Sequence, residues 1–291
     1  MSPEQPPRVV AIFGPTGVGK TAVAVALAPH LERPIAISAD ALQVYEGLGT
    51  LTGAASAEEQ ALLEHRLIGY VPVTEEYSAG AYAKRAHAEI DEALAQGRTP
   101  IVVGGTGLYL RAALTGLDLR PPVPPEVRER IEREMRRRGP DAMHAELAET
   151  DRVRVAPADR KRITRLLELA EVGAQGPEGD QLWTADTRHP TVLFGLTMER
   201  DALDRRIDTR MTEIFAAARE KVERAEAAGA SRTARSAVGY EDLLKGDLDA
   251  LKRRARKLAR RQLTWMRKLA AVQLVDMTEK DPAEGARAIA G

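Results

Sequence analysis

The chain of 291 residues contains no cysteine, which excludes disulfides, thiolate metal sites and a cysteine nucleophile. It also lacks any apolar run near the roughly 18–20 residues that a membrane-spanning helix requires. Aromatic residues make up only 4% of the chain against a hydrophobic content of 44%, so aliphatic side chains must build most of the core. These absences predict a cytoplasmic protein with no membrane partner.

Charge of either sign is not in excess, because 43 basic residues balance 43 acidic ones. Locally, however, residues 251–268 are densely basic and contain no acid, which favours contact with a polyanion. Residues 128–138 are also rich in arginine but interleave it with Glu129, Glu132 and Glu134. That spacing favours a solvated helical face on which arginine and glutamate pair.

Short apolar runs at residues 9–13, 35–38, 100–103 and 191–196 predict buried strands. Helical patterns separate them, among them residues 78–96 with Ser78 as the N-cap. Alternating strands and helices predict an α/β fold with a parallel sheet, here of the P-loop NTPase-like type. A further strand is expected at residues 272–275. After residue 196 we expect a long helix whose apolar stripe packs in the core and comprises Leu203, Ile207, Met211, Phe215, Ala218 and Val222.

The middle of the chain differs from its two ends. Residues 126–172 are rich in arginine and glutamate and contain no strand-like run, and prolines such as Pro124 and Pro125 precede them. We therefore predict a core formed by residues 1–118 and 185–291, with a helical insertion at 119–184.

The first strand leads directly into the sequence GPTGVGKT, which matches the P-loop pattern at every position. Its glycines allow backbone N–H groups to surround phosphate oxygens, and the following helix presents its positive N-terminal end. The lysine adds a charge on the outer phosphates, and the threonine hydroxyl can hold Mg²⁺. The predicted phosphate-binding residues are Gly14, Pro15, Thr16, Gly17, Val18, Gly19, Lys20 and Thr21.

The P-loop identifies phosphates but not a reaction, and read alone it suggests ATP. The third strand ends in Gly-Gly-Thr and supplies no Walker-B carboxylate. Asp40 stands at the carboxyl end of the second strand, where ligands of open α/β sheets bind. It is a candidate general base, and equally a candidate turn or N-cap residue. A small-molecule kinase with a helical lid and a nucleic-acid-binding NTPase switch both remain open at this point, although the missing acid argues against the switch.

Several stretches in order resemble the tRNA dimethylallyltransferase (tRNA isopentenyltransferase) family in its bacterial form. Besides the P-loop they are Ile37–Tyr45 (ISADALQVY), His65–Leu67 with Tyr77–Ala79, Val103–Tyr109 (VGGTGLY), Asp159 with Arg162, Arg165 and Glu168, Val238–Tyr240 (VGY), and Arg260–Arg267 (RRQLTWMR). The VGGTGLY and RRQLTWMR stretches are the most specific to the family. Departures include Ala41 and Ser236, where the family has serine and a glutamine or arginine.

The resemblance implies transfer of a dimethylallyl group from dimethylallyl diphosphate to N6 of the adenosine beside the anticodon of tRNA. It implies Asp40 and Thr106 as catalytic residues, Arg210 beside the P-loop on the diphosphate, and Mg²⁺ on Thr21. It also implies a tRNA partner and an enzyme that we expect to be monomeric. The implied tRNA contacts are Asp40, Ala41, Leu42, Gln43, Thr106, Arg128, Lys161, Arg162, Ile163, Thr164, Arg165, Ser236, Ala237, Val238, Gly239, Tyr240 and Glu241. A kinase stays the alternative.

Overall fold

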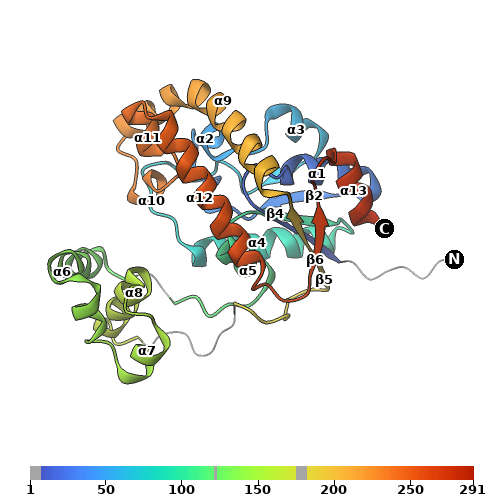
Figure 1. Ribbon diagram of the computed structural model, residues 1–291. Helices are drawn as coiled ribbons and strands as arrows, with labels where there is room; N and C mark the ends of the chain where they lie inside the picture. The colour runs from blue at the N-terminus through green and yellow to red at the C-terminus, as the bar shows by residue number, and fades with distance from the viewer. Residues whose placement is uncertain (1–7, 121–122, 175–181) are drawn as a thin grey trace. The chain divides into compact units, whose positions relative to one another are not determined.

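The computed structural model describes residues 8–120, 123–174 and 182–291 (Figure 1). The chain separates into two compact units, one formed by Met1–Leu117 with Leu182–Gly291 and the other by Asp118–Gln181. The sequence placed its helical insertion at residues 119–184. Each unit is described by itself below.

The first unit contains a six-stranded, all-parallel sheet in the order β3-β2-β4-β1-β5-β6. The predicted parallel α/β fold is therefore confirmed, as are the five predicted strands. The additional strand, β3, has only two residues, too few to leave an apolar pattern in the sequence. The strands are β1 (Val9–Phe13), β2 (Ile35–Ser38), β3 (His65–Arg66), β4 (Pro100–Gly104), β5 (Thr191–Thr197) and β6 (Val272–Asp276).

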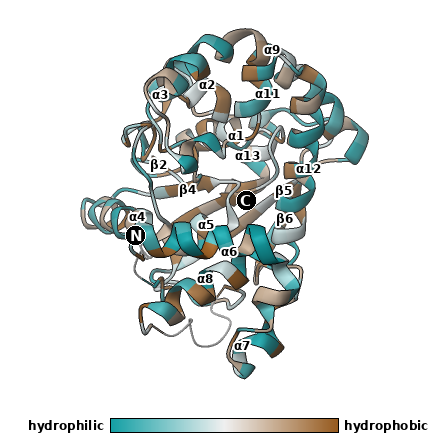
Figure 2. Ribbon diagram, turned by 90° about the vertical axis from the view of Figure 1, so that its left-hand side faces the viewer, coloured by the Kyte–Doolittle hydropathy of each residue, from teal (hydrophilic) through white to brown (hydrophobic). Residues whose placement is uncertain are grey.

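Helices cover both faces of this sheet, which explains why β1 and β2 are buried along their whole length (Figures 1 and 2). The pair α1 and α13 packs on one side, and the pair α4 and α5 packs on the other. Helix α9 packs against α12, α11 and α2. The helices of the unit are α1 (Lys20–Leu27), α2 (Gly49–Thr52), α3 (Ala57–Leu62), α4 (Ala79–Ala95), α5 (Gly107–Leu114), α9 (Arg200–Ala227), α10 (Arg232–Arg235), α11 (Tyr240–Lys245), α12 (Leu248–Met266) and α13 (Pro282–Ala290), with a 3₁₀ turn, η1, at Ala28–His30.

Two local predictions can be compared with the helices directly. Ser78 caps α4 as expected, since its hydroxyl accepts a hydrogen bond from the Ala81 amide. The apolar stripe of α9 is confirmed except at one position, where Ile214 is buried and Phe215 is only half-buried. The prediction for Phe215 was wrong because both positions fall on the same helical face, and packing rather than periodicity selects between them.

The second unit consists of α6 (Pro125–His144), α7 (Glu149–Arg154) and α8 (Arg160–Glu171), and its described part contains no strand. A small apolar core unites these helices and comprises Ile131, Met135, Met143, Leu147, Val155 and Ile163. Helix α6 is interrupted at Gly139, whose φ of 80° is not helical, just before Pro140. Its arginines pair with nearby glutamates, for example Arg137 with Glu134 at 2.6 Å, so the predicted pairing along this helix is confirmed.

Within the described residues, no helix of the chain combines the length and apolarity needed to cross a membrane.

Candidate active site

The P-loop connects β1 to α1 and brings a lysine into the interior of the first unit. Gly19 caps α1 with a φ of 98°, a left-handed conformation that favours glycine. Lys20 Nζ donates hydrogen bonds to the carbonyl oxygens of Gly14 and Pro15, each at 3.0 Å. Burial lowers the pKa of Lys20 to about 8; the charge of Asp40 opposes this shift, and Arg210 adds to it.

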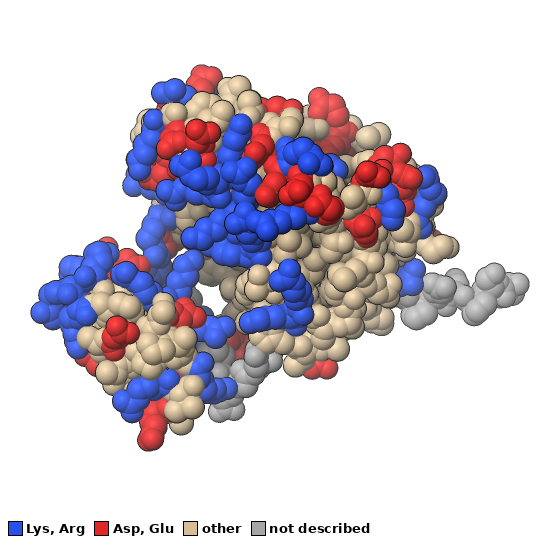
Figure 3. All heavy atoms as spheres, in the orientation of Figure 1, with Lys and Arg blue, Asp and Glu red and all other residues tan. Residues whose placement is uncertain are grey.

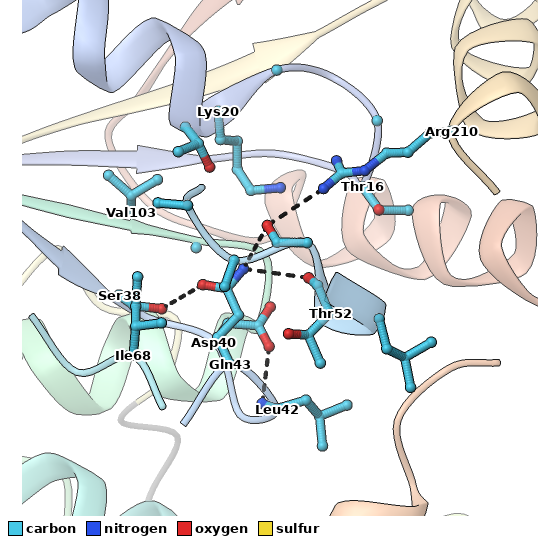
Figure 4. A pocket seen from close by; sticks show the side chains of 18 of the residues that line it. Thr16, Lys20, Ser38, Asp40, Leu42, Gln43, Thr52, Ile68, Val103 and Arg210 are labelled. Atoms are coloured by element: carbon cyan, nitrogen blue, oxygen red, sulfur yellow. Dashed lines mark hydrogen bonds between the residues drawn. The ribbon is translucent and has the colours of Figure 1, made fainter. Parts of the chain in front are cut away.

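A cavity of about 280 Å³ opens beside this loop, entirely within the first unit (Figure 4). The P-loop contributes Thr16, Gly17, Gly19, Lys20 and Thr21 to its wall. Several other parts of the chain contribute to it, among them β2 with the segment after it, the segment around α2, the end of β4, and α9 with α12. Outside the P-loop the polar and cationic side chains in the wall include Ser38, Asp40, Gln43, Thr52, Glu59, His65, Arg210 and Gln262.

Asp40 follows β2 directly and faces the same cavity as Lys20. Its Oδ1 accepts a hydrogen bond of 3.0 Å from the Leu42 amide, so the carboxylate also shapes the local turn. Burial raises the pKa of this carboxyl group, while bonds from backbone amides, the charge of Lys20 and a bond to Thr106 act in the opposite direction. A half-buried carboxylate near a half-buried lysine in one cavity is the arrangement expected of a proton acceptor at a reaction centre.

Gln43 links the end of β2 to the segment after α2. Its Oε1 accepts from the Ser38 hydroxyl at 2.8 Å, and its Nε2 donates to the carbonyl oxygens of Thr52 and Gly53 at 3.4 and 3.2 Å (Figure 4). Arg210 donates to the same Gly53 carbonyl at 3.4 Å, and burial lowers the pKa of this guanidinium. The segment containing Thr52 and Gly53 was not predicted as part of the site, because nothing in its sequence reveals these long-range bonds.

Thr106 lies at the end of β4, as the N-terminal cap residue of α5. Its hydroxyl accepts a hydrogen bond of 3.4 Å from the Ala41 amide, which holds the threonine next to the Asp40 turn. Gln262 of α12 bridges the P-loop and the same turn of β4, through Thr16 and Gly105. Gln262 was not predicted as a site residue; the only signal was its place in the RRQLTWMR stretch.

Of the predicted tRNA-contact residues 236–241, the first four form the turn between α10 and α11, and the last two begin α11. Val238 lines the cavity, and Ser236 and Glu241 are exposed. Ala237 and Tyr240 are buried, and the Tyr240 hydroxyl donates to Glu226 at 3.1 Å. Direct contact with a ligand at this turn is therefore open to the exposed positions, while the buried ones hold the turn in shape.

The other predicted tRNA contacts, Arg128 and residues 161–165, lie in the second unit. Arg128 and Arg165 flank the nearly buried Glu168, at 3.6 and 3.2 Å. Lys161 and Arg162 are exposed, and Thr164 is partly buried. Ile163 is fully buried in the core of the unit, so its side chain supports the helix rather than meeting solvent.

The basic helix α12 is less free of partners than its sequence indicates. Three of its arginines pair with acids from α11 and α9: Arg254 with Asp242, Arg256 with Asp208, and Arg260 with Asp204, at 3.1, 2.8 and 3.9 Å. Arg253, Lys257 and Arg261 are exposed and make no ion pair with any described residue. These three residues, termed the α12 stripe below, are spaced four apart and therefore share one face of the helix. Lysine and arginine side chains gather over this region in Figure 3.

Among the described residues, no group of three or more His, Asp or Glu side chains could cage a metal ion. Mg²⁺ bound with a phosphorylated ligand does not require such a cage, since phosphate oxygens and water supply most of its ligands. The Thr21 hydroxyl in the cavity wall is sufficient protein donor for that arrangement. The residues present therefore fit Mg²⁺ that arrives with a diphosphate.

A parallel sheet with a glycine-rich loop between its first strand and first helix defines a P-loop-like α/β protein. The IPP transferase family model matches residues 43–269, and the chain belongs to this family. A tRNA dimethylallyltransferase of Anaeromyxobacter dehalogenans is 40% identical over 279 residues, which cover 90% of this chain and 92% of that protein. A second one, from Bradyrhizobium, is 39% identical over 281 residues, covering 89% and 90%.

A solved structure gives the same result. The tRNA isopentenylpyrophosphate transferase of Bacillus halodurans superposes with a TM-score of 0.71 at 31% identity, covering 97% of this chain and 94% of that one. The chain is thus a transferase of the tRNA-prenylating family, and the kinase alternative is not favoured.

Proposed function

We propose that this protein transfers the dimethylallyl group of dimethylallyl diphosphate to N6 of the adenosine that follows the anticodon in tRNA. The observation that carries the proposal is one cavity holding two kinds of group: the P-loop with Lys20 and Arg210, and the half-buried carboxylate of Asp40. The first kind suits a departing diphosphate, and the second suits an amine that must lose a proton. Its relatives named above are tRNA dimethylallyltransferases.

The leaving-group side consists of cations and backbone amides. As the bond between C1 of the dimethylallyl group and the diphosphate oxygen breaks, negative charge grows on that oxygen. Lys20 and Arg210 lie beside the loop, and both would stabilise this charge in a site shielded from water. Mg²⁺ held on the Thr21 hydroxyl would supply further neutralisation of the diphosphate when bound.

The acceptor side consists of Asp40 and Thr106. The N6 amine forms the new C–N bond and releases one proton, and Asp40 is placed to accept it. Thr106 is held next to Asp40 by the Ala41 amide, so its hydroxyl is available to orient the adenine. The adenosine must leave the anticodon-loop stack to reach a buried group, which costs least in a single-stranded loop.

Apart from this adenosine, the tRNA would contact exposed cations outside the cavity. The α12 stripe offers three such charges on the first unit, and Lys161 and Arg162 offer two on the second. Contacts of this type bind phosphates and position an RNA without reading its sequence. The monomeric state and the cytoplasmic location expected from the sequence stay predictions.

The proposal is tested by incubating the protein with radiolabelled dimethylallyl diphosphate, Mg²⁺ and an anticodon stem-loop RNA, without ATP. We expect label in the RNA, and none when the target adenosine is replaced by guanosine. Consumption of ATP without transfer of label would instead support a kinase and refute the proposal.

Removal of the α12 stripe is expected to weaken RNA binding and to flatten its salt dependence. Changing all three residues to glutamine removes up to three phosphate contacts, each of which adds about 0.7 to the log–log salt slope for a single strand. Affinity measured across a salt series checks this. A matched control changes three exposed cations on other elements, Arg8, Lys280 and Arg287, and should leave the slope unchanged. Equal slopes for the two variants would remove the stripe from the RNA-binding surface.

A further inference from the structure

Gln262 is a buried amide whose two ends bond to different parts of the active site. Its Oε1 accepts a hydrogen bond of 2.7 Å from the Thr16 amide of the P-loop. Its Nε2 donates a bond of 2.9 Å to the Gly105 carbonyl, at the end of β4. The residue is only 6% exposed, so neither bond competes freely with water. The strands before the two loops, β1 and β4, pair up to Phe13 and Gly104, and the glutamine side chain adds a connection beyond that point.

The Gln262 amide packs directly against the backbone of Gly105. A Cβ atom at position 105 would lie 2.3 Å from Gln262 Nε2 and 3.2 Å from the Gly14 carbonyl oxygen. The absence of a side chain at Gly105 therefore lets the amide, the start of the P-loop and the β4 turn touch one another. Thr106 is the next residue, so the position of Gly105 directly determines where the Thr106 hydroxyl stands.

The two loops have different tasks in the proposed reaction, on which this inference rests. The P-loop holds the leaving diphosphate, and the β4 turn holds Thr106 beside Asp40 and the acceptor amine. Transfer requires the two reacting atoms to approach within about 3–3.5 Å and in line, and a misplacement of about 1 Å can cost 10²-fold in rate. A residue that sets the distance between the two loops therefore affects the transfer rate more than it affects the affinity for either substrate.

We propose that Gln262 is a positioning residue that fixes the spacing between the P-loop and the Gly105–Thr106 turn. Its side chain borders the cavity, and both polar atoms of its amide already bond to the protein. It acts by holding the Thr16 amide and the Gly105 carbonyl at the two ends of one side-chain amide, which aligns the donor with the acceptor.

The test replaces Gln262 with methionine, which keeps the length of the side chain and removes both hydrogen bonds. We expect the single-turnover transfer rate at saturating substrates to fall about 30- to 100-fold. The affinity for inorganic diphosphate should stay within about threefold, because Lys20 and Arg210 are unchanged. Gln273→Met on the exposed edge of β6 is the matched control and should retain the wild-type rate.

A second substitution reaches the same contact from the other side. Gly105→Ala places a methyl group where the Gln262 amide lies, so it should slow transfer in the same way. Because both changes break one bridge, the double variant Gly105→Ala/Gln262→Met should be hardly slower than the worse single variant. Multiplicative effects would mean that the two residues act separately, and would overturn the proposal. A Gln262→Met transfer rate within threefold of the wild-type rate would also overturn the proposal. Parallel losses of transfer rate, diphosphate affinity and thermal stability in this variant would overturn it as well.

A structural measurement keeps this inference separate from the proposed reaction. In Gln262→Met the Thr16 amide loses its acceptor, so its hydrogen exchange, followed by NMR, should accelerate at least about tenfold. Unchanged protection of Thr16 would refute the bridge even in an active enzyme. If the wild-type protein failed to prenylate the stem-loop, the proposed function would fall. Accelerated hydrogen exchange of the Thr16 amide in Gln262→Met would still support the bridge between the two loops.

Discussion

Replacement of Asp40 by asparagine is expected to lower the rate of dimethylallyl transfer by about 10²- to 10⁴-fold, the usual contribution of a positioned general base. The substitution keeps the size of the side chain and an oxygen for the Leu42 amide, so the turn after β2 should survive. What disappears is the capacity to accept the N6 proton. Single-turnover transfer to the stem-loop RNA measures the loss.

Diphosphate binding should be nearly unaffected in this variant, since the phosphates are held by the P-loop. Loss of the Asp40 charge removes a repulsion on the diphosphate, but it also removes the interaction that raises the pKa of Lys20. Binding should therefore be compared at mildly acidic pH, where Lys20 stays charged in both proteins. Asp201→Asn, at an exposed site in the first turn of α9, is the control and should leave transfer unchanged. Wild-type turnover by Asp40→Asn would eliminate the general-base role.

The same carboxyl group predicts the acidic side of the pH profile. Burial raises its pKa above the ordinary range of an aspartate, and the protonated form cannot accept the N6 proton. Transfer should therefore decline on acidification at a higher pH than an exposed aspartate would give.

Much of the site could be predicted from sequence because its chemistry is local. The strand, the P-loop and helix α1 follow one another within residues 9–27, so a short apolar run and the eight-residue motif after it indicate a strand, a loop and a helix start. Asp40 could be placed for a similar reason, since the carboxyl ends of parallel strands meet at one edge of the sheet. Its role in a turn is observed in the bond from the Leu42 amide, whereas its role as a general base stays a prediction that its place in the cavity wall supports.

The parts that could not be predicted depend on contacts distant in the chain. Gln262 is 246 residues from Thr16, and no periodicity or motif spacing states that the two meet. Acid partners of α12 are also distant in the chain: Asp204 and Asp208 lie on α9, and 48 residues separate Asp208 from Arg256. The basic stretch of this helix is therefore partly neutralised in the fold. The choice of Ile214 over Phe215 belongs to the same category, since neighbours in space decide it.

Replacement of Lys20 by methionine should lower kcat/KM for dimethylallyl diphosphate by about 10²- to 10³-fold, the usual cost of removing a donor from a developing anion. The ammonium group is held in the cavity wall by the carbonyls of Gly14 and Pro15, so no other cation can easily occupy its place. The affinity for the stem-loop RNA should change little, because RNA binding relies on exposed residues. An equal loss of RNA affinity would point to a collapsed fold instead.

The pH profile offers a sharper test of this lysine. Burial has moved its pKa down from 10.5 to about 8, so the free enzyme is charged at pH 7 and loses the charge as the pH rises through 8. Since kcat/KM reports the free enzyme, it should fall above about pH 8, whereas kcat should hold to higher pH because bound diphosphate favours the ammonium form. Lys20→Arg is slower, but its guanidinium stays charged, so the alkaline decline of kcat/KM should disappear. If the decline persisted unchanged in that variant, it would have to arise from a group other than Lys20.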